Sequence, residues 1–114
     1  MYLDVNNMLI KDKDIKKITK QDGKVILKLV ENDNPEFIEL SFNEFTYIRR
    51  QLIKNMYKTK TDMYYIPSIY DMDKQNGVGC LYYNDGSMEK VSEEDYQKIS
   101  ELYNRYKNPD EYQL

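Results

Sequence analysis

Two places in the chain join a strand-like segment directly to a serine that can cap a helix. Ser41 is followed three residues later by Glu44, and Ser92 is followed at the same distance by Asp95. In such a capping box the hydroxyl accepts a hydrogen bond from the third helical amide, while the acid accepts one from the serine's own amide. The sequence therefore predicts two helices, at about residues 42–57 and 93–107, with strands before each.

Turn signals divide the segments before each serine into short strands. Asp22-Gly23 and Asp85-Gly86 lie between apolar runs, which is a strong hairpin signal. Pro67 limits its own segment to an edge or bulged strand, because proline has no amide hydrogen. Residues 71–77 are expected to be a loop. The predicted strands cover residues 15–18, 24–30, 36–40, 63–70, 78–83 and 87–91.

These elements define an α+β fold, with an antiparallel sheet of about six strands and two helices in a single domain of residues 1–114. The halves 9–57 and 63–107 repeat the same order of elements. That similarity leaves two interpretations: a duplicated β-β-β-α unit, or the resemblance that any strand-to-capped-helix junction shows. Residues 108–114 are expected to form a loose tail. The apolar helix positions predicted to be core are Phe45, Ile48, Leu52, Ile99 and Leu102.

The chain has no histidine and one cysteine. Histidine-based triads, histidine metal sites and thiolate zinc sites are therefore excluded. Cys80 lies in an apolar strand and is interpreted as a small core residue. We accordingly expect no catalytic residues, no metal and no cofactor, and no enzymatic activity.

Three further motifs fail on spacing or context. Residues 71–77 alternate oxygen-bearing side chains, but an EF-hand loop that began at Asp71 would need glycine where Asn76 stands. Gly77-Val78-Gly79 lacks the lysine of a phosphate loop and leads into a strand. The acids at 93–95 are expected at a helix N-terminus, because they oppose the positive end of the helix dipole.

The chain has no apolar run long enough to span a membrane, and its first residues lack the basic start and apolar stretch of a secretory signal. A single cysteine cannot form an internal disulfide, which agrees with a reducing compartment. We therefore expect a cytoplasmic protein.

Tyrosine is unusually abundant, with twelve in 114 residues. Tyrosine is common in interfaces because one end is apolar and the other polar. The leading hypothesis is therefore a non-catalytic protein-interaction module, a small regulator or inhibitor of the kind that mobile elements encode. It would bind a protein partner, or a second copy of itself, through a tyrosine-rich sheet surface. The alternative is that these rings are covered within the monomer. The candidate residues are Tyr64, Tyr65, Tyr70, Tyr82 and Tyr83.

Two basic groups support a different hypothesis. One comprises the lysines between residues 11 and 20, where aspartates dilute the charge. The other lies on and after the first predicted helix and comprises Arg49, Arg50, Lys54, Lys58 and Lys60. The alternative function is therefore a nucleic-acid or nucleotide-binding module that uses Arg49, Arg50 and Lys54, although the formal net charge of −3 does not favour it. An enzyme that works through carboxylates and tyrosines is a third possibility.

Overall fold

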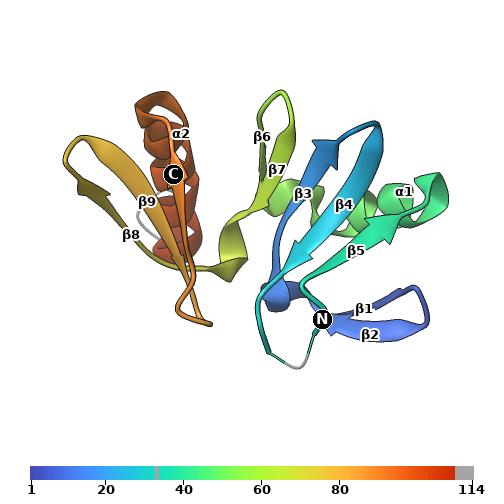
Figure 1. Ribbon diagram of the computed structural model, residues 1–114. Helices are drawn as coiled ribbons and strands as arrows, with labels where there is room; N and C mark the ends of the chain where they lie inside the picture. The colour runs from blue at the N-terminus through green and yellow to red at the C-terminus, as the bar shows by residue number, and fades with distance from the viewer. Residues whose placement is uncertain (33, 110–114) are drawn as a thin grey trace.

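The computed structural model describes residues 1–32 and 34–109. This part of the chain forms two α-helices and ten strands, arranged in three antiparallel sheets of two, three and five strands (Figure 1). The predicted α+β class, with antiparallel strands and two helices, is confirmed. The strands outnumber the six expected, because the N-terminal hairpin and the short strand at Met56–Lys58 were not anticipated and the strand predicted at 63–70 is divided in two. Most of the predicted C-terminal tail, residues 110–114, lies outside the described residues.

The five-stranded sheet has the order β5-β4-β3-β7-β6. The turn between β3 and β4 is formed by Asp22 and Gly23, whose φ angles are 53° and 75°. Two successive positive φ values give a hairpin turn whose twist matches that of the strands, as the Asp-Gly pair predicts. The strands are β3 (Ile15–Gln21), β4 (Lys24–Leu29), β5 (Phe37–Leu40), β6 (Met56–Lys58) and β7 (Asp62–Tyr65).

An N-terminal hairpin of β1 (Tyr2–Val5) and β2 (Met8–Lys11) forms the two-stranded sheet. Asn6 and Asn7 make its turn with φ angles of 52° and 62°, a conformation that asparagine tolerates better than most residues. The hairpin contributes buried aliphatic side chains to the core beneath the five-stranded sheet.

The first helix, α1 (Phe42–Leu52), begins with the predicted capping box. The Glu44 amide donates to the Ser41 hydroxyl at 3.2 Å, and the Ser41 amide donates to the Glu44 carboxylate at 2.9 Å. The helix ends at Leu52, before the predicted residue 57. After a short 3₁₀ turn, residues 56–58 become β6 and pair with β7.

The chain leaves the five-stranded sheet through a 3₁₀ turn, Ile66–Ser68, which contains Pro67. The predicted strand at 63–70 is therefore divided between two sheets, because proline cannot donate to a strand ladder. The second part continues as β8 (Ile69–Gln75), so most of the expected loop at 71–77 is strand. Only Asn76 and Gly77 form a turn, with φ angles of 53° and 79°.

The three-stranded sheet consists of β8, β9 (Val78–Tyr83) and β10 (Met88–Val91), and α2 (Glu93–Lys107) packs against it. At the start of α2 the Asp95 amide donates to the Ser92 hydroxyl at 3.1 Å. The Asp95 carboxylate instead accepts a hydrogen bond from the Tyr57 hydroxyl at 2.9 Å. This contact ties α2 to β6 of the other sheet.

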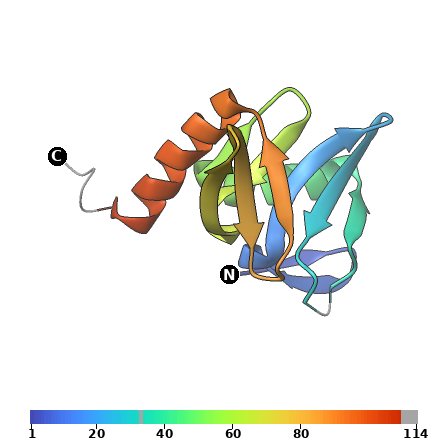
Figure 2. The same cartoon turned by 60° about the vertical axis from the view of Figure 1, so that its left-hand side comes forward.

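Each of the two larger sheets has its own hydrophobic core. The first lies between the five-stranded sheet, α1 and the N-terminal hairpin, and the second between the three-stranded sheet and α2. In Figure 1, α1 lies against the five-stranded sheet and α2 against the three-stranded sheet, and Figure 2 shows the three-stranded sheet in front with α2 extending to one side. Three strands and a capped helix thus occur twice. Whether the two halves arose by duplication stays a prediction.

A cluster of polar contacts, here called the inter-sheet joint, connects β3 to the β9–β10 hairpin. The Lys17 ammonium donates to the Glu89 carboxylate at 2.7 Å, and the Tyr64 hydroxyl donates to the same oxygen at 2.8 Å. Lys16 lies 3.4 Å from the Asp85 carboxylate.

Asp85 of the joint is strongly favoured in its ionised form. Burial raises the pKa of this carboxyl, but hydrogen bonds from the amides of Glu31 and Ser87, the Ser87 hydroxyl and the charge of Lys16 outweigh burial. The pKa of Asp85 is therefore held well below its ordinary value.

Among residues 1–32 and 34–109, neither helix has the length and apolar character that crossing a bilayer requires.

Candidate functional site

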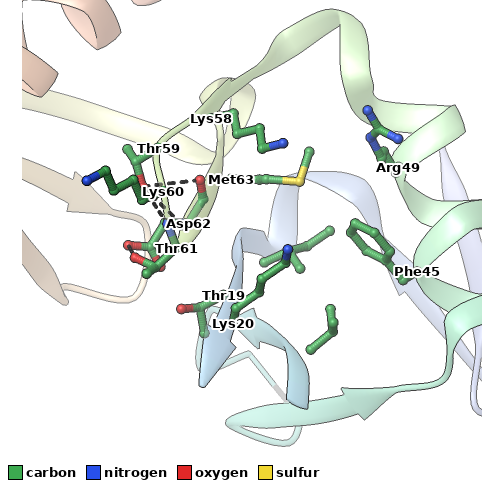
Figure 3. Close-up of a pocket in the computed structure, with 12 residues that line it drawn as sticks. Thr19, Lys20, Phe45, Arg49, Lys58, Thr59, Lys60, Thr61, Asp62 and Met63 are labelled. Atoms are coloured by element: carbon green, nitrogen blue, oxygen red, sulfur yellow. Dashed lines mark hydrogen bonds between the residues drawn. The ribbon is translucent and has the colours of Figure 1, made fainter. Parts of the chain in front are cut away.

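A shallow depression, here called the basic groove, opens between α1, the β6–β7 turn and the ends of β3 and β4 (Figure 3). Four basic side chains line it, against one acid, Asp62. All four basic residues are exposed. They are Lys20, Arg49, Lys58 and Lys60.

The β6–β7 turn is held by one threonine. The Thr59 hydroxyl accepts hydrogen bonds from the amides of Asp62 at 3.0 Å and Thr61 at 3.4 Å, and the Thr59 amide donates to the Asp62 carbonyl at 2.8 Å. The Lys20 amide donates to the Thr61 carbonyl at 2.8 Å, which fixes the end of β3 beside this turn. The turn therefore presents Lys60 on a well-defined backbone.

The four basic side chains do not all point the same way. In Figure 3 the ammonium groups of Lys20 and Lys58 extend into the groove, and Arg49 rises from α1 at its far wall. The Lys60 side chain points away from the other three, on the outer side of the turn. The arrangement offers positive charge inside the groove and at its rim.

The cations of the groove are available for a ligand. Elsewhere in the described part of the chain, acids lie within 4 Å of Lys16, Lys17, Lys24 and Lys74, whereas none of the four groove residues takes part in an ion pair. The one groove acid, Asp62, lies 3.5 Å from the Lys17 ammonium and accepts a hydrogen bond from the Thr61 hydroxyl at 3.2 Å. Its charge is thus largely balanced.

The groove is too small to enclose a free nucleotide. Its volume is about 140 Å³, whereas small-molecule pockets usually measure roughly 300–1,000 Å³. Ile18 and Met63, both buried, contribute apolar walls, and Phe45 is partly exposed beside them. A phosphate group of a larger molecule fits these dimensions and this charge better than a whole nucleotide does.

The structure separates Lys54 from the two arginines. Arg49 lines the basic groove and also, together with Arg50, the neighbouring exposed face of α1. Lys54 lines a different depression with Leu102 of α2. Lys58 and Lys60 belong to the same sequence group as Arg49. Lys20 belongs to the other basic group, and it lies beside them only because β3 pairs with β7 and β7 with β6.

Three of the five tyrosines in the predicted binding surface are internal. Tyr64, Tyr65 and Tyr83 are buried, with 5%, 3% and 3% of their surface exposed, so they are covered within the monomer. Burial raises the pKa of all three hydroxyls, and carboxylates raise it further. The other two are not buried. Tyr70 is exposed, and the Tyr82 hydroxyl donates to Asp73 at 2.9 Å, which raises the pKa of Tyr82 to about 12.

Buried tyrosines instead hold the fold together. The Tyr65 hydroxyl donates to the buried Asp12 carboxylate at 2.7 Å, and Asp12 also pairs with the N-terminal ammonium at 3.3 Å. The pKa of Asp12 is raised by burial, but these contacts outweigh burial and lower it overall. Tyr83 packs in the second core with the Lys16 ammonium 5.1 Å from its ring centre.

The sequence and the fold were compared with known proteins. No protein-family model matches the chain, and no curated protein matches it in sequence. Among solved structures, the chain is similar to the LytTr DNA-binding domain of a putative methyl-accepting/DNA response regulator from Bacillus cereus. The two superpose with a TM-score of 0.54 over 90% of this chain and 94% of that one, at 12% identity. At this identity the likeness shows a shared fold.

This comparison corrects the leading functional hypothesis. The sequence favoured a protein-interaction module, a regulator or inhibitor with a tyrosine-rich binding surface. The solved domain with this fold is a DNA-binding domain, and three of the five tyrosines invoked are internal. The hypothesis was wrong because it interpreted an abundance of tyrosine as a surface property, whereas the two cores use tyrosine as a structural residue.

Proposed function

We propose that this chain is a non-catalytic nucleic-acid-binding domain that contacts the phosphate backbone of DNA through the basic groove. The observation that carries the proposal is the gathering of four exposed cations around one depression, none of which pairs with an acid within residues 1–32 and 34–109. The fold it shares with a DNA-binding domain supports the same conclusion. The negative net charge is no obstacle, because phosphates respond to the local field.

Each groove residue has a distinct part in this proposal. Lys20 and Lys58 donate into the groove, where a phosphate oxygen would accept. Arg49 can offer two parallel donors to one phosphate, which lysine cannot. Lys60, directed outward from the turn, reaches a neighbouring phosphate.

Acidic residues elsewhere orient the approach of the polyanion. The three-stranded sheet and the start of α2 carry a concentration of acids, including Asp71, Asp73 and Glu93, none of which lines the groove. Repulsion there and attraction at the groove would direct DNA to α1 and the β6–β7 turn.

The test is the salt dependence of binding to a labelled DNA duplex, followed by fluorescence anisotropy. Four phosphate contacts predict a slope of about −3.6 in log K against log salt, or roughly a 150-fold loss of affinity between about 50 and 200 mM salt. Lys20→Gln and Lys58→Gln should each reduce the slope by about 0.9.

The matched control is Lys24→Gln. Lys24 is exposed and lies 3.8 Å from the Glu39 carboxylate, and it lines no part of the groove. It should leave the slope unchanged. Absence of binding at protein concentrations above ~10⁻⁴ M in low salt, or an equal loss in Lys24→Gln and Lys58→Gln, would refute the proposal.

A further inference from the structure

One face of α1 is exposed and combines aromatic with basic side chains. We call it the α1 strip; it comprises Phe42, Phe45, Thr46, Arg49, Arg50 and Ile53. These residues recur three or four positions apart, so they share one side of the helix. Phe42 is 80% exposed and Ile53 is 45% exposed, so the strip presents apolar surface to solvent beside its two arginines. The strip borders a shallow depression.

The α1 strip is continuous with the basic groove. Phe45 and Arg49 line both depressions. The only acid of α1, Glu44, is occupied at the helix start by the Ser41 amide. Arg49 and Arg50 take part in no ion pair within the described residues. A ligand that crosses from the groove onto the strip therefore meets two unpaired guanidinium groups and then an exposed ring.

We propose that the ligand of the groove continues along the α1 strip as single-stranded nucleic acid, with an unpaired base stacked on Phe42. This rests on the proposed function and specifies its substrate class. The required ligand carries negative charge at regular intervals and a flat apolar surface between the charges, and single-stranded nucleic acid has both. In a duplex the bases are stacked on one another, so a helix that met its backbone would leave Phe42 facing sugar and phosphate.

In this proposal the arginines and the phenylalanine of the α1 strip contact different parts of the ligand. Arg49 and Arg50 neutralise successive phosphates, and Phe42 supplies the platform for the base. Stacking on an aromatic side chain is tolerant of sequence, because every base has a flat face. The strip therefore confers preference for an unpaired strand without preference for a particular base.

The test compares Phe42→Ala with the unaltered chain on three labelled ligands of equal length: an oligothymidine, an abasic strand with the same phosphates, and a duplex. Phe42→Ala should weaken oligothymidine binding by roughly 5- to 150-fold and leave binding to the abasic strand unchanged. Phe42→Leu, which keeps apolar bulk but lacks a ring, should behave like Phe42→Ala. The control is Phe37→Ala on β5, a ring 53% exposed that lines neither the groove nor the strip.

The outcomes separate the two proposals. If the unaltered chain binds no nucleic acid, both proposals fail. Suppose instead that it binds all three ligands, and that Phe42→Ala changes none of the affinities or lowers those for oligothymidine and the abasic strand equally. The stacking proposal is then refuted, while the backbone-binding proposal stands. Sedimentation of the same variants detects self-association; loss of a dimer in Phe42→Ala without loss of oligothymidine affinity would show that the strip binds a second copy, and would overturn the inference. The high exposure of Phe42 makes loss of folding unexpected, and circular dichroism verifies this.

Discussion

Replacing Gly79 with alanine tests how the three-stranded sheet and α2 pack. Gly79 lies in β9, the central strand, and a β-carbon placed there would lie 2.6 Å from both Cβ and Cδ2 of Tyr96. Rotating the Tyr96 ring cannot relieve the first contact, because Cβ is attached directly to the α2 backbone. The helix must therefore move away from the sheet.

The magnitude follows from two opposing effects. Overpacking a core costs about 1–3 kcal/mol, while replacing glycine by alanine at a compatible position stabilises by about 0.4–1 kcal/mol through the unfolded chain. The φ of Gly79 is not in the left-handed region, so the second effect applies in full. We expect Gly79→Ala to lower the free energy of unfolding by about 1–2 kcal/mol.

The assay is urea denaturation of Gly79→Ala, Tyr96→Ala and the double variant. Tyr96→Ala removes the contact with Cδ2 but keeps the contact with Cβ. The double variant should therefore recover only part of the stability that Gly79→Ala loses, and this gives a measurable coupling between the two positions. Stabilisation by Gly79→Ala alone would refute the reasoning, because it would mean that the helix does not approach the strand as closely as 2.6 Å.

Three further predictions concern stability. Leu52→Ala should lower the free energy of unfolding by about 2–5 kcal/mol in urea denaturation, since Leu52 is 2% exposed in the first core. Tyr65→Phe should cost about 1–3 kcal/mol in the same assay and lower the melting temperature, because it leaves the buried Asp12 carboxylate short of a donor. The third concerns pH. Because the folded-state pKa of Asp85 is depressed, its contribution to stability is complete above the unfolded value of about 3.9 and is lost as the pH falls toward the folded value. Thermal melts should therefore show Asp85→Asn to be less stable than the unaltered chain near neutrality, with a difference that narrows below about pH 4.

Local chemistry explains which parts of the fold could be predicted. The start of α1 depends on Ser41 and Glu44 alone, and the β3–β4 turn depends on Asp22 and Gly23, so each is set by neighbours in the sequence. The end of α1 is different. Residues 53–57 continue the helical spacing of apolar residues, yet Met56–Lys58 pairs with β7, and that long-range pairing overrides the local preference.

The candidate site was predictable only in part, for a geometric reason. The helix ends at Leu52, so Lys54 lies in the 3₁₀ turn that follows and lines another depression, whereas Arg49 and Arg50 share one exposed face of α1. The groove instead combines Arg49 with lysines from β3 and from the β6–β7 hairpin. Closeness along the chain groups Arg49 with Lys58 and Lys60, but it does not add Lys20, because that depends on which strands pair.

Net charge is a poor guide to the charge of the basic groove, because several acids in this chain are engaged in structural contacts. Glu89 and Asp85 hold the inter-sheet joint, and Asp62 shares Lys17 with Glu89. Lys17 consequently serves the joint and also balances the single acid of the basic groove. The formal net charge subtracts Asp62 from the groove lysines, although the Asp62 carboxylate is already paired with Lys17. The quantity that bears on phosphate binding is the number of exposed cations without an acid partner, and at the basic groove four cations have none among the residues that the structure describes.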